Sequence, residues 1–179
     1  DGIDASCGDC TINPDSDCWC ETGYGNPDGD MSSNGCECTI TNGNVEACDG
    51  IDNDCNNQTD EGCNDDGDDY CDAAMTTVGT PPICLSGGGD CDDTDPILNP
   101  GTVWYKDQDG DLYSDGTTLT QCAQPTGYYL NTSLTATSGD CDDTNPILNP
   151  TTVWYKDQDG DLYSNGNTQT QCTQPANYY

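Results

Sequence analysis

The sequence contains no histidine and no phenylalanine, and Lys106 and Lys156 are the only basic residues in a chain of 179. Without histidine the chain lacks the usual general base, the Ser-His and Cys-His catalytic pairs, and imidazole ligands for zinc, copper or haem. It also lacks any apolar run that approaches the ~18 residues of a transmembrane helix. We therefore expect no enzymatic activity and no direct membrane insertion.

Negative charge dominates what is present. The chain has 34 acidic residues and a formal charge of -32 at pH 7. A field of this sign repels phosphate backbones and anionic lipid headgroups, so nucleic acid is not an expected partner. Because basic residues are almost absent, the carboxylates need another counter-charge, and Ca²⁺ is the commonest hard cation outside cells.

Cysteine is abundant, with 15 residues, while hydrophobic residues make up only 31% of the chain. Small units with too little apolar area for a core are commonly held together by disulfides and metals. This composition predicts an oxidising compartment, so we expect an extracellular protein that is secreted or attached to the cell surface. The odd number of cysteines leaves at least one without a partner in its own chain.

An Asp-rich segment occurs twice, beginning with GDCDDTDPILNP at Gly89 and GDCDDTNPILNP at Gly139. Residues 89–129 and 139–179 share 33 of 41 positions, and a degenerate copy, NDDGDDY from Asn64, precedes them. Such repetition predicts one structural unit per copy. The expected parts are a cysteine-rich head at 1–63, a degenerate calcium-loop repeat at 64–88, a first full repeat at 89–138 and a second, truncated repeat at 139–179.

Motifs at both ends of the sequence are incomplete. DGIDASC at Asp1 repeats the pattern DGIDNDC at Asp49, without the cysteine that precedes the latter. The second repeat stops at Tyr179, opposite Tyr129 of the first. We expect a processed product, with further repeats after Tyr179 or a continuation supplied by another subunit.

Regular secondary structure is expected to be sparse. Residues 102–105, their copy at 152–155, and more weakly 127–130 are β-prone, whereas proline, glycine and asparagine interrupt the rest. The predicted fold class is small, disulfide-rich and mostly irregular or β, with elongated tandem calcium-loop repeats, short strands and little helix. Each repeat can bury only a few apolar side chains, too few to hold it without help. They are Ile97, Leu98, Val103, Trp104, Leu112 and Tyr113.

The spacing of the aspartates predicts a metal loop. Asp107, Asp109 and Asp111 fall at positions 1, 3 and 5 of an EF-hand loop, and Asp115 falls at position 9. Leu112 stands where the EF-hand has glycine, and Thr118 stands where it has the bidentate glutamate, which excludes a complete EF-hand. The missing ligands must come from elsewhere.

The nearest acidic cluster in the sequence is the one that begins at Asp90, so we predict one composite site per repeat, made from this cluster and the loop. The ligands of the first full repeat are Asp90, Asp92, Asp93, Asp95, Asp107, Asp109, Asp111 and Asp115. The corresponding residues of the second are Asp140, Asp142, Asp143, Asp157, Asp159, Asp161 and Asn165, and those of the degenerate copy are Asn64, Asp66 and Asp68.

The alternative is a solvated, disordered acidic linker. Two observations favour ligation. Glycines and aromatic residues keep their register with the aspartates, and the changes between the copies, Asp95 to Asn145 and Asp115 to Asn165, preserve a carbonyl oxygen.

The segment CDGIDNDC from Cys48, followed by DEGC from Asp60, resembles the metal-binding motif of MopE-type bacterial surface proteins. The WYKDQDGDLYS and GDCDD segments resemble the repeat that accompanies it, and DxDGD is similar to thrombospondin type 3 calcium loops. Asn56-Asn57 stands in place of the family's Asp-Gly. The resemblance implies secretion, divalent-metal binding and no catalytic residues. In the head it implies ligation by Asp49, Asp52, Asp54, Asp60 and Glu61.

Three questions of cysteine chemistry stay open. Cys122 can pair with Cys141, or it can pair with Cys91 and close one repeat around its loop. Cys7 and Cys10 form a C-x-x-C sequence, for which a structural disulfide is preferred over a redox pair. Zinc on Cys18, Cys20, Cys36 and Cys38 is chemically feasible, but oxidised pairs suit the compartment better.

Covalent glycans are a further expectation. Asn57 and Asn131 begin N-glycosylation sequons, and the linker 132–138 is rich in Thr and Ser.

Two functional hypotheses follow. The first is a structural subunit of a surface fibre, stalk or appendage, rigidified by Ca²⁺ and disulfides, whose copies dock head-to-tail. The alternative is a monomeric cell-surface module that is adhesive or binds metal. In both, metal binding stabilises the folded repeats.

Overall fold

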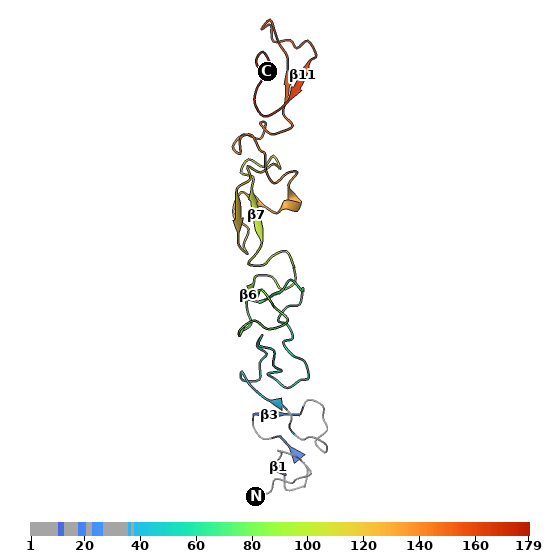
Figure 1. The fold of residues 1–179 in the computed structure, drawn as a ribbon, viewed down its shortest axis with the longest axis vertical. Coiled ribbons are helices and arrows are strands. Elements are labelled where there is room, and N and C mark those ends of the chain that lie inside the picture. The colour runs from blue at the N-terminus through green and yellow to red at the C-terminus, as the bar shows by residue number, and fades with distance from the viewer. Residues whose placement is uncertain (1–10, 13–17, 21–22, 27–35, 37) are drawn as a thin grey trace. The chain divides into compact units, whose positions relative to one another are not determined.

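The computed structural model describes residues 11–12, 18–20, 23–26, 36 and 38–179. The chain divides into two compact units, residues 1–100 and 101–179. Most of the described backbone is irregular, and the strands are two to four residues long (Figure 1). Within the described residues, the helical structure is a single 3-10 turn, η1 (Asn131–Ser133). The fold is therefore small, irregular and disulfide-rich, which confirms the predicted class.

In the first unit, β1 (Thr11–Ile12) pairs with β2 (Cys18–Trp19), and β3 (Tyr24–Gly25) pairs with β4 (Cys38–Thr39), both antiparallel. The parallel pair of β5 (Tyr70–Asp72) and β6 (Gly87–Asp90) matters most for the site. Because β5 follows the 64–69 loop and β6 ends at Asp90, this pairing brings two acidic segments together. The glycine-rich sequence of β6 gave no strand signal.

Cysteines form the centre of the first unit. Cys48, Cys63, Cys71 and Cys84 are fully buried in one cluster, against which Met75 packs. The disulfides Cys48–Cys63 and Cys71–Cys84 make up this cluster. Disulfides thus replace the aliphatic and aromatic core that the composition cannot supply.

In the second unit, β7 (Val103–Lys106) lies between β8 (Thr118–Thr120) and β9 (Tyr128–Tyr129) in an antiparallel sheet (Figure 1). The same register recurs fifty positions later, where β10 (Val153–Tyr155) pairs with β11 (Thr168–Thr170). The predicted strands at 102–105, 127–130 and 152–155 are confirmed. β8 and β11, which contain the short sequences TLT and TQT, were not predicted.

Burial in the repeats is smaller than expected. Trp104 is 3% exposed, and its indole N–H donates to the Gln121 carbonyl at 2.7 Å. By contrast Ile97, Val103 and Leu112 are 49%, 39% and 50% exposed, so their expected place in a core is wrong. The sheet has three short strands, and its Val103 side chain faces outward.

The remaining disulfides answer two of the questions that the sequence left open. Cys141 bonds Cys172, which excludes the Cys122–Cys141 pairing and closes the second repeat on itself. Cys91 and Cys122 are each part of a disulfide. The disulfides Cys20–Cys36 and Cys38–Cys55 exclude the zinc set.

Residues 7–10 lie outside the described part of the chain. The disulfides as a group indicate an oxidising environment. No helix in the described residues has the length and hydrophobicity needed to cross a bilayer.

Candidate metal centres

Three loops share the pattern Asp/Asn-x-Asp-Gly-Asp, at 64–68, 107–111 and 157–161. In each, the first side chain accepts backbone N–H groups of its own loop. The Asp107 carboxylate accepts from Gly110 at 2.8 Å and from Leu112 at 3.1 Å. Asp157 binds Gly160 and Leu162 in the same way, at 2.8 and 2.9 Å. The backbone of each loop therefore turns about the side chain of the loop's first residue.

The residue after each triad adopts a left-handed backbone conformation, with φ of +74° at Asp69, +73° at Leu112 and +68° at Leu162. This is the position at which an EF-hand loop has glycine. An L-residue in this conformation costs about 1–2 kcal/mol. The loops thus keep the EF-hand type of turn although aspartate or leucine replaces glycine.

The best-defined cluster joins the degenerate loop to the end of β6. Asp66, Asp68 and Asp90 each place a carboxylate oxygen within 4.8 Å of the others, and Asp90 is only 1% exposed. Their Oδ1 atoms accept backbone N–H groups of Asp68, Tyr70 and Asp92, whereas all three Oδ2 atoms are buried without a hydrogen-bond partner. Buried carboxylate oxygens normally have hydrogen-bond partners or a counter-ion. The three Oδ2 atoms have no such partner, so the cluster offers a site for a cation.

The pKa shifts at this cluster also indicate that it lacks a positive charge. Burial raises the pKa of Asp90 above its ordinary value, and the nearby carboxylates of Asp68 and Asp66 raise it further, while the Asp92 N–H lowers it. Burial also raises the pKa of Asp93, while the hydrogen bond from the Asp65 N–H lowers it. The ionised forms are therefore unfavourable here unless a cation balances them.

A second cluster contains Asp107, Asp109 and Asp111. The Oδ2 atoms of Asp109 and Asp111 are buried without partners, and so is Oδ2 of Asp140 from the following repeat. Burial raises the pKa of Asp109, and the charges of Asp111 and Asp140 add to this effect. Burial likewise raises the pKa of Asp140, with a contribution from Asp111. Asp140 therefore faces the 107–111 loop.

Hydrogen bonds show how loops and clusters are paired. The Asp65 N–H donates to the Asp93 carboxylate at 3.0 Å, and the Gln108 N–H donates to the Asp143 carboxylate at 2.9 Å. These contacts join the 64–68 and 107–111 loops to the Cys-Asp-Asp segments that follow them in the chain. The predicted partner of the 107–111 loop was instead the segment at 90–95, which precedes it. The prediction chose the acidic segment nearest in the sequence. In the structure, the chain first forms the rest of the repeat and then comes back to the loop, so the segment that follows is the one in contact.

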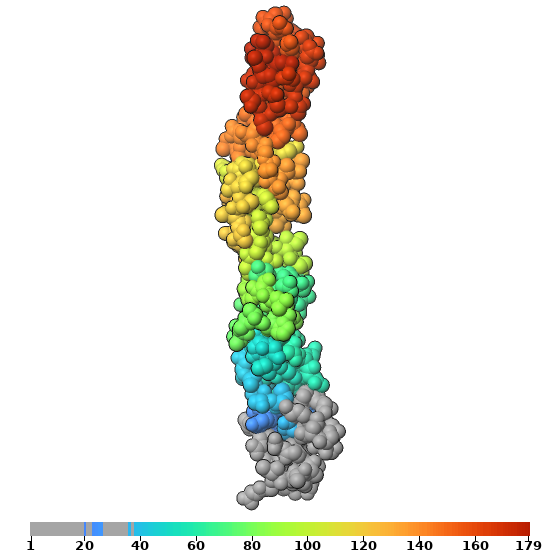
Figure 2. Space-filling view, viewed as in Figure 1, coloured from blue at the N-terminus to red at the C-terminus, as the bar shows by residue number. Residues whose placement is uncertain are grey.

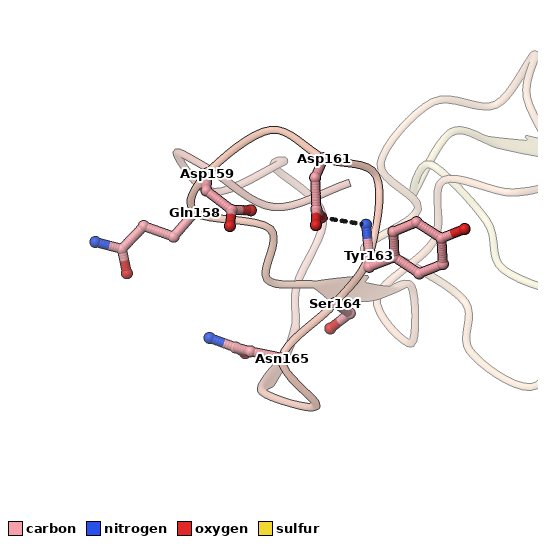
Figure 3. A pocket seen from close by; sticks show the side chains of 6 residues that line it. All are labelled: Gln158, Asp159, Asp161, Tyr163, Ser164 and Asn165. Carbon is pink, nitrogen blue, oxygen red and sulfur yellow. Dashed lines mark hydrogen bonds between the residues drawn. The ribbon is translucent and has the colours of Figure 1, made fainter.

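The third loop, residues 157–161, is more exposed to solvent than the other two. Asp157, Asp159 and Asp161 form a group like the others, but Asp159 and Asp161 are exposed. They line a hollow of about 520 Å³ with Gln158, Tyr163, Ser164 and Asn165 (Figure 3). Burial alone would raise the pKa of Asp157, but the N–H groups of Gly160 and Leu162 hold it below its ordinary value.

The head contains a different group, formed by Glu46, Asp54 and Glu61. The Glu46 carboxylate accepts the N–H groups of Asn53, Asp54 and Asp60, at 2.8, 3.0 and 3.2 Å. Oε2 of Glu61 is buried without a partner. Sequence reasoning missed Glu46, because it lies two residues before Cys48 and outside the CDGIDNDC motif.

Other predicted ligands hold turns in place. Asp60 accepts the N–H groups of Asp49 and Gly50, and Asp52 accepts those of Asn56 and Asn57. Local acceptors of the same kind are Asp49, Asp92, Asp95, Asp142 and Asn165. None of these residues belongs to a carboxylate group in the described part of the chain.

Asp115, the predicted ligand at position 9, binds the Thr117 N–H at 2.7 Å and Lys106 Nζ at 3.5 Å. Burial opposes ionisation of Asp115, but these hydrogen bonds and the Lys106 charge keep its pKa below the ordinary value. Asp115 therefore neutralises a lysine instead of joining the cluster at Asp107.

Comparison of the chain with protein-family models, with curated proteins and with solved structures gives no match.

Proposed function

We propose that this protein is a calcium-binding extracellular structural protein whose irregular loops are held in shape by Ca²⁺ and disulfides. The observation that carries the proposal is the cluster of Asp66, Asp68 and Asp90, where three buried carboxylate oxygens converge without a partner. Asp109, Asp111 and Asp140 likewise each have a buried Oδ2 atom without a partner, and the charges of Asp111 and Asp140 raise the pKa of Asp109.

The donor set favours calcium over other cations. Each cluster offers carboxylate oxygens, the chain has no histidine, and Cys63, Cys71 and Cys84 beside the first cluster are in disulfides. Zinc and copper prefer imidazole or thiolate, which are missing here. Calcium accepts six to eight oxygens in flexible geometry, so backbone carbonyls and water can complete the coordination of an irregular loop.

Calcium binding would act on the fold through linkage. In the metal-free protein the convergent carboxylates repel one another, and a divalent ion removes that repulsion. Because Asp66 and Asp90 lie on different segments, one ion also connects two parts of the chain that are distant in sequence. The free energy of binding thus appears as stability of the junction.

The MopE resemblance and the duplicated repeats support a role as a subunit of a surface fibre, stalk or appendage, with copies in head-to-tail contact. The proposal assigns the carboxylates a structural task and no catalytic one. Electron microscopy of the purified protein in millimolar calcium and after chelation tests the fibre. Filaments that shorten or loosen without calcium support it, and single monomers in both conditions contradict it.

Calorimetric titration of Ca²⁺ into metal-stripped protein tests calcium binding. We expect affinities of about 10⁻⁴ to 10⁻³ M, the range of extracellular modules. Asp90→Asn should remove one ion from the stoichiometry. The matched control is Asp92→Asn, since the Asp92 carboxylate accepts hydrogen bonds from the Thr94 backbone and hydroxyl and belongs to no carboxylate group in the described part of the chain. No heat in the unaltered chain, or equal stoichiometry in both variants, would refute the proposal.

A further inference from the structure

Two junctions are built in the same way, and each joins a metal loop to the Cys-Asp-Asp segment that follows it. In the first junction the Asp65 N–H donates to the Asp93 carboxylate at 3.0 Å. In the second the Gln108 N–H donates to the Asp143 carboxylate at 2.9 Å. We call these two hydrogen bonds the first and second outer contacts. Their donors are the second residues of their loops, and their acceptors are equivalent residues of the duplicated GDCDD segment, so they can be compared directly.

The second outer contact includes a cation supplied by the chain itself. Lys106 Nζ forms an ion pair with Asp143, whose side chain is only 8% exposed. The hydrogen bond to Asp143 raises the pKa of Lys106, so the ammonium form is favoured. A charge-assisted contact of this kind is about twice as strong as a neutral one. The Asp143 carboxylate is therefore neutralised without a metal ion.

The first outer contact has no such cation. Cys63 stands at the position of Lys106, and it is fully buried in its disulfide with Cys48. Both ion pairs found among the described residues belong to Lys106, so Asp93 forms no ion pair in that part of the chain.

Negative charge also surrounds Asp93. Burial raises the pKa of Asp93, and the Asp65 N–H lowers it. The charges of Asp65, Asp72 and Asp66 raise it further. Gln108, the counterpart of Asp65, carries no charge. In the metal-free chain the Asp93 carboxylate is therefore repelled by its neighbours, and one backbone N–H opposes that repulsion.

A further difference between the loops does not offset this one. The first loop has Asn64 where the second has Asp107, so the second loop carries one more carboxylate. That carboxylate is 1% exposed and accepts the N–H groups of Gly110 and Leu112. Its hydrogen bonds lie inside its own loop, and the ion pair remains at the second outer contact.

Calcium at the first junction would reduce the repulsion on Asp93. Asp66 belongs to the cluster with Asp68 and Asp90, and its charge is one of those that raise the pKa of Asp93. An ion at the cluster neutralises Asp66 and so weakens that repulsion. Residues 64–93, coloured turquoise to green in Figure 2, lie at the molecular surface, so dissolved ions have access to this junction.

We propose that Lys106 is a positioning residue that substitutes for part of the role of calcium at the second junction. Its ammonium group holds the second outer contact at calcium concentrations at which the first outer contact opens. The calcium dependence of the first outer contact rests on the proposed function. As the calcium concentration falls, the chain therefore loosens at residues 64–93 before it loosens at residues 106–143.

The test follows amide hydrogen exchange of Asp65 and Gln108 by NMR in the isotope-labelled full chain during a calcium titration. We expect calcium removal to speed exchange at Asp65 about tenfold more than at Gln108. Lys106→Gln should increase the calcium effect at Gln108 about tenfold and leave the effect at Asp65 unchanged. Lys106→Arg keeps the charge and should behave like the unaltered chain.

Two further variants serve as controls. Lys156→Gln removes the same charge from a lysine that forms no ion pair among the described residues, and it should change the exchange of neither amide. Asp65→Gln gives the first loop the residue that the second loop has at 108. It removes one of the charges that repel Asp93, so the calcium effect on the amide at position 65 should fall.

Calcium uptake, measured in the same samples by competition with a chromophoric chelator, separates this inference from the proposed function. Uptake with equal calcium effects at Asp65 and Gln108 overturns the role of Lys106 and leaves the proposed function intact. The same conclusion follows if Lys106→Gln behaves like the unaltered chain. Absence of uptake overturns the proposed function and this inference together.

Discussion

The carboxylate of Asp143 accepts a hydrogen bond from the backbone N–H of Gln108 at 2.9 Å, across 35 residues of chain. The same carboxylate forms an ion pair with Lys106 and is 8% exposed. A main-chain donor and a cation therefore hold the second repeat against the metal loop of the first. Charge-assisted bonds of this kind are stronger than neutral ones and define a register.

Removing the charge of Asp143 should loosen this junction. Asp143→Asn keeps an oxygen for the Gln108 N–H but loses the ion pair, and we expect a loss of about 1–2 kcal/mol in the free energy of unfolding. Urea denaturation at fixed calcium measures it. The control is Asp142→Asn, since the Asp142 carboxylate accepts hydrogen bonds from the Thr144 N–H and hydroxyl and forms no ion pair among the described residues. Equal losses in the two variants would argue against the ion pair.

Asp109→Ala should affect two repeats at once. Asp109 belongs to the cluster with Asp111, and the charge of Asp140 in the following repeat also raises the pKa of Asp109. We expect faster amide hydrogen exchange at 107–116 and at 139–145 in calcium, with exchange at 64–72 unchanged. Acceleration limited to 107–116 would show that the loop binds its ion alone.

The pH dependence should reverse when calcium is removed. The pKa of Asp90 is raised in the fold, so the folded state holds this proton more tightly than the unfolded one. In metal-stripped protein, acidification through the raised pKa therefore adds stability, which is complete below the ordinary value of about 3.9. With calcium bound, protons compete with the ion and acidification removes stability.

Denaturation midpoints between pH 7 and 4, with and without calcium, measure both slopes. Asp90→Asn isolates the contribution of this group, since the variant should lose its part of the metal-free slope. A metal-free slope that is the same in the variant and the unaltered chain would exclude Asp90 as its source.

The Cys71–Cys84 disulfide should support the metal cluster as well as the core. It closes a loop with a sequence separation of 13, and Cys71 lies in β5 directly after the Asp68 loop. Changing both cysteines to serine should cost about 3 kcal/mol and weaken calcium binding at Asp66, Asp68 and Asp90. The Cys141→Ser, Cys172→Ser variant is the control, with that affinity expected to be unchanged.

The sequence predicted which residues belong to the sites better than it predicted which segments come together to form them. The EF-hand spacing at Asp107, Asp109 and Asp111 was visible because these ligands lie on one short loop. The contribution of Asp140 to that loop was not, since it depends on a chain return through residues 134–138 that no local pattern marks. Glu46 was missed for a related reason: it reaches its neighbours through backbone N–H groups, and such contacts leave no periodic signal.

The strands at Val103 and Val153 followed from β-branched and aromatic residues. β6 could not be predicted, because its pairing is imposed by the neighbouring disulfides on a glycine-rich sequence of low strand propensity. Burial was overestimated at Val103 and Leu112, since Trp104 is the one hydrophobic side chain that residues 101–179 bury.

The identical sequences of the metal loops at residues 108–114 and 158–164 have an evolutionary consequence. Each Cys-Asp-Asp segment binds the metal loop that precedes it, so whole units of fifty residues can be gained or lost by recombination while every internal boundary keeps both partners. Length can then vary among descendants of such a gene without any redesign of its interior, and the near-identity of residues 89–129 and 139–179 records one such event.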